Sequence, residues 1–67
     1  MQLTNRELAI LKLISFEKTT SEIADHLFIS FDTVKSYRKN LFKKMGVTNA
    51  AGLVRKGFET NILTNIN

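Results

Sequence analysis

The sequence predicts an all-α protein, a four-helix bundle folded as a single domain. Apolar residues recur at spacings of three or four, the period of a helix with one buried face. Each of four such stretches begins with a residue type that caps helix N-termini. We expect helices at roughly 5–15, 20–27, 31–45 and 50–59. Because the chain has only 67 residues, we expect one domain over 1–60 and a flexible tail over 61–67.

Two capping boxes open the first two helices. Thr4 and Glu7 have the spacing at which each side chain can bond the other residue's backbone N–H, and Thr19 and Glu22 repeat it. The core faces of these helices follow at helical spacing: Ile10, Leu11, Ile14, Ile23, Ala24 and Leu27. Ala24 is small, which lets a neighbouring helix approach closely.

The third helix organises the rest of the chain. Ser30 is a suitable N-cap, and Gly46 can take the left-handed conformation that ends a helix. The buried stripe consists of Val34, Tyr37, Leu41 and Met45. The polar face carries Lys35, Ser36, Arg38, Lys39, Asn40 and Lys43. Such a face suits contact with phosphates and base edges. Only residues 28–30 separate this helix from the preceding one, so the pair is a helix-turn-helix candidate.

The fourth helix carries more apolar surface than one core contact requires. Asn49 is its expected N-cap. The apolar residues are Ala50, Leu53, Val54, Gly57 and Phe58. We expect part of this face to meet a second subunit. The alternative is that Leu53 and Phe58 simply complete a small core.

Charge is distributed unevenly along the chain. The net charge is +4 overall, yet residues 33–58 carry seven Lys and Arg with no Asp or Glu. Surface helices usually interleave both signs, because like charges repel and opposite charges pair. A solvated basic face is one interpretation, and a polyanionic partner explains the asymmetry better.

Composition excludes several classes of function. Without cysteine, and with His26 as its one histidine, the chain has no disulfide framework, no thiolate metal site and no donor set for tetrahedral zinc. No nucleophile–base pair or phosphate-binding glycine motif is recognisable, so we expect neither an enzyme nor a bound cofactor. No membrane span or secretory signal is recognisable either, and we expect a cytoplasmic protein. His26 falls on the outward side of its helix, where a solvent-exposed residue without a role is favoured over a pH-sensitive phosphate contact.

The order of the motifs resembles a known family. Leu3-Thr4-x-Arg6-Glu7, Glu22-Ile23-Ala24, Ile29-Ser30-x-x-Thr33-Val34-Lys35 and Lys44-Met45-Gly46-Val47 are similar to the LuxR/GerE-type DNA-binding domain of bacterial transcription regulators. The resemblance covers residues 3 to about 58 and implies a four-helix bundle whose second and third helices form the helix-turn-helix. It implies sequence-specific binding of double-stranded DNA, with the third helix in the major groove and the fourth mediating a homodimer on two half-sites. RNA polymerase is a further partner to consider.

The resemblance also assigns positions. The implied DNA-binding residues are Thr20, Ser30, Thr33, Lys35, Ser36, Arg38, Lys39, Lys43 and Lys44. Lys35, Ser36 and Lys39 match positions that enter the groove, whereas Thr20, Ser30 and Thr33 match positions near phosphates. For Lys44, a head group hydrogen-bonded inside the bundle is an equal alternative. The implied dimer residues are Ala50, Leu53, Val54, Gly57 and Phe58.

Three positions depart from the family pattern. Tyr37 replaces a usual histidine, and we expect its ring to pack; Arg38 replaces an apolar residue and adds a phosphate ligand. Gly52 replaces a usual glutamate, and we place it inside the fourth helix, where glycine costs about 1 kcal/mol relative to alanine. Either that helix is weak or two backbones approach closely across a dimer.

Two other functions remain open: a sigma-factor-like promoter-reading domain, and a protein-interaction module that no longer reads DNA.

Overall fold

The computed structural model describes residues 3–63, and the described chain is all-α. Its helices are α1 (Asn5–Ser15), α2 (Thr20–Leu27), α3 (Phe31–Met45) and α4 (Ala50–Glu59). These bounds coincide with the predicted ones, and no strand occurs within residues 3–63. The predicted fold class is therefore confirmed.

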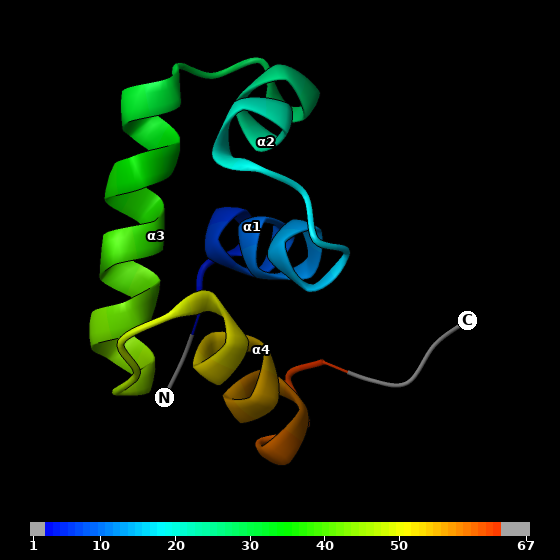
Figure 1. Cartoon of the computed structure of the whole chain (residues 1–67), viewed down its shortest axis with the longest axis vertical. Helices are drawn as coiled ribbons and strands as arrows, with labels where there is room; N and C mark the ends of the chain where they lie inside the picture. Colours follow the sequence, from blue (N-terminus) through cyan, green and yellow to red (C-terminus); the bar gives the residue numbers. More distant parts are fainter. Residues whose placement is uncertain (1–2, 64–67) are drawn as a thin grey trace.

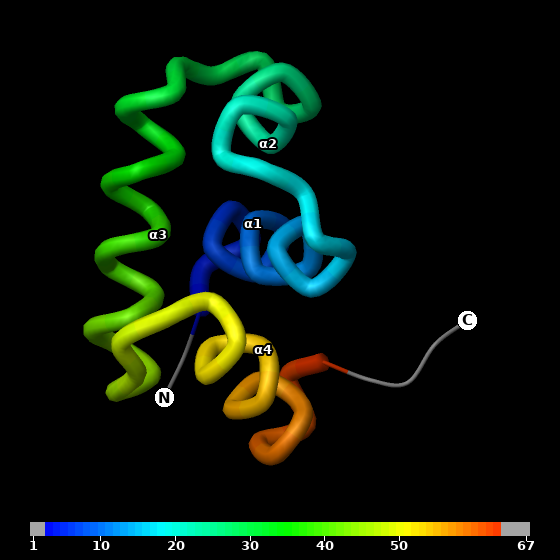
Figure 2. The backbone as a smooth tube through the Cα atoms, in the orientation of Figure 1, coloured from blue at the N-terminus to red at the C-terminus, as the bar shows by residue number. Residues whose placement is uncertain are grey.

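The helices are arranged around α1. Figure 1 shows α1 between α2 and α4, with α3 running along one side of all three. Figure 2 shows the tube of α1 nearly end-on at the centre of this arrangement. Helix α1 contacts each of the other helices, and so does α3. The domain measures only 29 × 27 × 20 Å, so α3 packs with one side on the bundle and keeps its opposite side on the surface.

Both predicted capping boxes form. The Thr4 hydroxyl accepts from the Glu7 N–H at 3.1 Å, and Glu7 Oε1 accepts from the Thr4 N–H at 2.9 Å. Thr19 and Glu22 repeat the arrangement at 3.1 and 2.8 Å. Each box satisfies backbone donors that have no partner within the helix. The two helix starts are thus set by residues three positions apart.

The turn between α2 and α3 is as short as predicted but uses an unexpected residue. Phe28 ends α2 in the left-handed conformation, at φ 58°, and its side chain is 94% exposed. The Ile29 N–H donates to the Ala24 carbonyl at 3.1 Å, and the Ser30 hydroxyl then accepts from the Thr33 N–H at 3.0 Å. Left-handed backbone at a bulky residue is uncommon, and nothing in the sequence pattern indicated it.

The start of α4 corrects the prediction for Gly52. This residue is the third of α4 and lies in its first turn rather than in the interior. Its N–H donates to the Asn49 side-chain oxygen at 2.7 Å. The side chains nearest to the position of a Cβ here belong to Asn49 and Val47 of the same segment. Gly52 therefore takes part in the local cap at the start of α4.

One apolar core draws on all four helices and on the segment after α4. Its buried members are Ile10, Leu11, Ile14, Ile23, Ala24, Val34, Leu41, Met45, Leu53 and Leu63. Three of the four residues of the stripe predicted for the third helix are among them, and the fourth, Tyr37, is half-buried and packs against the core as expected. The inner side of α3 is thereby held by the bundle.

The segment after α4 differs from the prediction. Leu63 is only 5% exposed, and its N–H donates to the Gly57 carbonyl at 2.9 Å. A Cβ on Gly57 would lie 2.7 Å from Leu63 Cδ1 and 3.6 Å from Leu11 Cδ2, so the absent side chain makes room for Leu63. The tail was expected to be flexible from residue 61, whereas in the structure Leu63 belongs to the core. Residues 64–67, the rest of that predicted tail, lie outside the described residues.

Gly46 closes α3 in the left-handed conformation, as predicted, at φ 67°. A Cβ at this position would meet no atom within 4 Å, so a side chain would be opposed by backbone strain alone. We expect Gly46→Ala to lower the free energy of unfolding by about 1 kcal/mol. Urea denaturation followed by circular dichroism measures this. An unchanged midpoint would show that the residue does not need the left-handed region.

Candidate nucleic-acid interface

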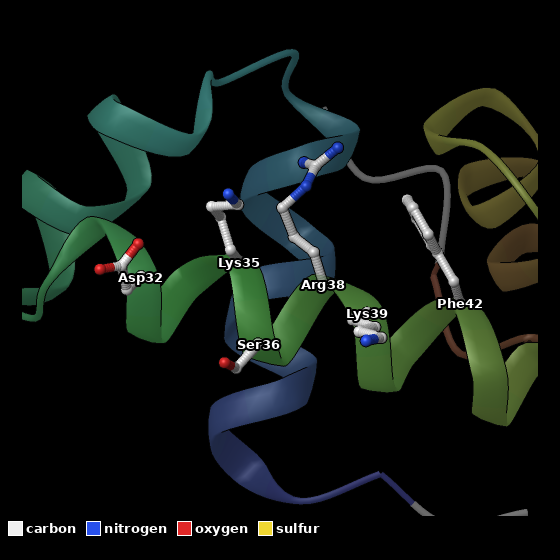
Figure 3. A pocket seen from close by; sticks show the side chains of 6 residues that line it. All are labelled: Asp32, Lys35, Ser36, Arg38, Lys39 and Phe42. Carbon is white, nitrogen blue, oxygen red and sulfur yellow. The ribbon is translucent and has the colours of Figure 1, made fainter.

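A shallow depression of about 550 Å³ lies on the outer side of α3. It is lined by Asp32, Lys35, Ser36, Arg38, Lys39 and Phe42, which we call the outer face of α3. In Figure 3, Lys35 and Arg38 extend to one edge of the helix, Ser36 extends to the other, and Lys39 points towards the viewer. The structure therefore brings four of the predicted DNA-binding residues onto one surface.

The predicted groove-entering side chains on this face are free to contact a ligand. Lys35, Ser36 and Lys39 are exposed. Within the described part of the chain, neither Ser36 nor Lys39 makes a side-chain hydrogen bond or an ion pair. The opposite side of the same helix is anchored by Val34 and Leu41, which are fully buried. The bundle thus fixes α3 by its apolar side and presents its polar side.

Two cation–π contacts involve cations of this face, and the sequence analysis did not predict either of them. Lys35 Nζ lies 5.9 Å from the centroid of the Phe31 ring, and Arg38 Cζ lies 5.6 Å from that of Phe42. In each pair the partners are four residues apart, so they are neighbours on the helix surface. The spacing of aromatic and basic residues was the signal that could have identified them. The contacts restrain two of the cations.

The predicted phosphate contacts occupy helix starts. Ser30 and Thr33 are exposed at the N-terminus of α3, with their hydroxyl oxygens 2.7 Å apart. Thr20 is the first residue of α2 and is half-buried. It lines a second depression, the side groove, whose lining includes Ile14, Thr20, Arg38, Ala50, Val54 and Arg55. Arg38 borders both depressions and so links the outer face of α3 to Thr20.

Lys44 has an internal role. Its ammonium lies 2.7 Å from Glu7 Oε1, the same carboxylate oxygen that caps α1. The Glu7 side chain is 6% exposed, whereas that of Lys44 is 39% exposed. The hydrogen bond from Lys44, followed by the one from the Thr4 backbone, holds the pKa of Glu7 below its ordinary value. Of the two interpretations of Lys44, the structure favours the head group bonded within the bundle. Lys43 is exposed.

The predicted dimer residues separate into two groups. Leu53 is fully buried, and Gly57 lies buried beneath Leu63, so neither can present a surface to a partner. The expectation that these two residues form a dimer face is therefore wrong, because they complete the core. Ala50 and Val54 are half-buried and Phe58 is 40% exposed, and these three follow each other at four-residue spacing.

Other site types have little support in the described chain. No group of three or more potential metal-binding side chains occurs in residues 3–63. In the same range, no helix is both long enough and apolar enough to cross a membrane. His26 is exposed, as its position on the second helix predicted.

Comparison with known proteins identifies the family. The profile of a family described as bacterial regulatory proteins, luxR family, matches residues 1–56. The chain belongs to this luxR family. The family consists of transcription regulators and not of enzymes, and DNA binding is what membership implies. The predicted resemblance is thereby confirmed.

Relatives of this luxR-family domain include regulators from several bacteria. It is 42% identical over 64 residues to the transcriptional regulatory protein MctR of Rhizobium johnstonii, covering 96% of this chain and 30% of that protein. It is 47% identical over 45 residues to the spore germination protein GerE of Bacillus subtilis, covering 67% of this chain and 61% of that protein. The domain thus spans less than two thirds of either relative.

A solved structure has the same fold. The luxR-family domain superposes on the response regulator ChrA of a heme-sensing two-component system with a TM-score of 0.90. The sequences are 27% identical, and the match covers 94% of this chain and 31% of that one. The four-helix arrangement therefore agrees with that of a response regulator.

Proposed function

We propose that this domain binds double-stranded DNA sequence-specifically, with the outer face of α3 in the major groove. The observation that carries the proposal is the exposed set Lys35, Ser36 and Lys39 on a helix whose opposite side is fixed in the core. Lysine ammonium groups donate to guanine O6 and N7, and a serine hydroxyl can contact any base edge. Because the core holds α3 in place, these groups keep fixed positions relative to one another and to the rest of the domain.

Backbone contacts would orient the helix in the groove. Ser30 and Thr33 lie at the N-terminus of α3, where free backbone N–H groups and the helix dipole favour a phosphate. Thr20 lies at the N-terminus of α2, and Arg38 lines the side groove together with it. Lys43 extends the cationic surface towards the other end of α3. Because Lys44 is engaged by Glu7, we omit it from the DNA contacts.

We infer that the DNA-bound form is a homodimer on two half-sites. The surface that fits this role is formed by Ala50, Val54 and Phe58 of α4, without the buried Leu53 and Gly57. A two-fold dimer matches an inverted repeat with half-sites about one helical turn apart. The proposed setting is transcription regulation in the cytoplasm. No feature of residues 3–63 singles out a surface for RNA polymerase.

Selection of bound duplexes from a random pool, at near-physiological salt, tests the function directly. Salt weakens phosphate-only binding, so enrichment then reports base reading. We expect an inverted repeat. Binding without an enriched motif would contradict sequence specificity, and failure to bind any duplex would favour the protein-interaction module.

Lys39→Ala and Lys43→Ala separate base reading from phosphate binding. We expect Lys39→Ala to weaken operator binding by about 1–3 kcal/mol and to relax preference at one base pair, because its ammonium is assigned to a base edge. Lys43→Ala should weaken operator and random DNA alike. Titration of both duplexes measures this, with Lys56→Ala, an exposed cation on α4, as the control for net charge. Equal losses on the two duplexes for Lys39→Ala would contradict its role.

A further inference from the structure

Phe31 is an exposed aromatic residue at a position where a core residue is not needed. It is the first residue of α3, and its side chain is 50% exposed. It is absent from the buried core and from the half-buried residues that pack against it, a group to which Phe42 does belong. The ring contact that the structure records for Phe31 is with the ammonium of Lys35. Packing of the domain therefore does not explain this side chain.

The position of Phe31 brings it close to where bases would lie. Recognition helices of helix-turn-helix proteins place their N-terminal residues against base edges in the major groove. The apolar group in that groove is the C5-methyl of thymine, and phenylalanine is among the side chains that contact it. An exposed ring on the first turn of α3 suits this ligand, because its burial against a methyl group removes apolar surface from water.

The contact with Lys35 couples two recognition groups. Lys35 Nζ and the ring centroid are 5.9 Å apart, which is no more than about two base-pair steps of roughly 3.4 Å. An ammonium that donates to guanine O6 or N7 would therefore set the ring against a base one or two steps away. Since the ring also restrains the lysine, the two side chains would act as one unit.

We propose that Phe31 is a specificity-determining residue that reads the C5-methyl of a thymine one or two steps from the guanine read by Lys35. The inference rests on the proposed function, since it requires α3 to lie in the major groove. It adds Phe31 as a contact residue and the thymine C5-methyl as its target, neither of which belongs to the contacts proposed for Lys35, Ser36 and Lys39. Phe28, which is 94% exposed but lies at the end of α2, has no such role.

Single-atom changes in the selected operator test the proposal. Each thymine is replaced in turn by deoxyuridine, which lacks only the methyl group, and each guanine by 7-deazaguanine, which lacks N7. Binding is titrated for the unchanged domain and for Phe31→Ala, Phe31→Leu and Lys35→Ala. Phe28→Ala is the matched control, because it removes an exposed ring from a position outside α3.

We expect deoxyuridine at one thymine of each half-site to weaken binding of the unchanged domain about fourfold, the effect of one methyl group left unburied. Phe31→Ala should bind the natural operator more weakly and become insensitive to that change. Phe31→Leu, which keeps an apolar side chain but not the ring, should retain part of the sensitivity. Lys35→Ala should lose the sensitivity to 7-deazaguanine and keep only part of that to deoxyuridine, because the ring is then no longer held by the lysine. Phe28→Ala should behave as the unchanged domain.

Two results would overturn the inference. Equal binding of the unchanged domain to the natural and all deoxyuridine operators would show that no thymine methyl is read. If Phe31→Ala abolished only the sensitivity to 7-deazaguanine, the ring would position Lys35 without touching a base. Both results differ from failure of the proposed function, which would appear earlier as the lack of any enriched operator. Circular dichroism melts of the variants exclude loss of folding as a cause.

Discussion

Glu7→Ala is expected to lower the free energy of unfolding by about 3 kcal/mol. One buried carboxylate oxygen accepts from the Thr4 backbone at 2.9 Å and from Lys44 at 2.7 Å. Removing the carboxylate removes one of the two hydrogen bonds of the capping box, while the Thr4 hydroxyl still accepts from the backbone N–H of residue 7. It also leaves the ammonium of Lys44 without this partner on a partly buried stem. The contact also joins α1 to the far end of α3, so its loss loosens the helix proposed to read DNA.

Urea denaturation of Glu7→Ala and Glu22→Ala measures this effect against a matched control. Glu22 has the same capping-box role at the start of α2, but it is exposed and its carboxylate makes no ion pair with a cation in residues 3–63. The loss for Glu7→Ala should exceed the loss for Glu22→Ala. Equal losses would show that the pair with Lys44 contributes nothing beyond the cap.

The same pair predicts a pH dependence with a defined sign. The hydrogen bond from Lys44 lowers the pKa of Glu7 in the folded state below its ordinary value of 4.5. A carboxylate with a lowered folded pKa contributes its stability above the ordinary value and loses it as the pH falls through the lowered one. The stability difference between the unchanged domain and Glu7→Gln should therefore shrink as the pH is reduced below about 4.5. The lowered pKa of Glu22 is present in both proteins and cancels.

Leu63→Ala is the second substitution with a large expected effect, a loss of about 3 kcal/mol in the free energy of unfolding. Leu63 is 5% exposed and fills the space above Gly57, beside Leu11. Truncating it removes buried apolar surface and leaves a cavity between the segment after α4 and α1. Because α4 is held against α1 partly through this contact, its outer side should also become less well ordered.

Thermal and urea denaturation check the prediction, with Ile62→Ala as the neighbouring control. Ile62 is only half-buried, so its truncation should cost clearly less. If Leu63→Ala were as stable as the unchanged domain, the segment after α4 would not be docked, and the flexible tail predicted from the sequence would be restored. Hydrogen exchange of the Leu63 amide, which donates to the Gly57 carbonyl, provides an independent readout.

Much of the candidate site could be read from the sequence because it lies on one helix. The period of Val34, Leu41 and the other buried residues defines the inner side of α3, and Lys35 and Lys39 then fall on the outer side by geometry alone. The aromatic partners Phe31 and Phe42 were within reach of the same reasoning, since each lies four residues from its cation. The left-handed Phe28 was not, because its conformation follows from closing a turn between two packed helices.

The sequence by itself determined the four helices, their caps and the inner and outer sides of each, because these depend on residues within about four positions of one another. The tertiary structure alone decided which side chains meet across the bundle. Glu7 and Lys44 are 37 residues apart, and no local pattern pairs them. Leu53 and Gly57 look available on an isolated amphipathic helix and become core only when α1 and Leu63 pack upon them. Burial is a property of the assembled bundle, so a helical pattern gives the apolar side of a helix but not how much of that side its neighbours cover.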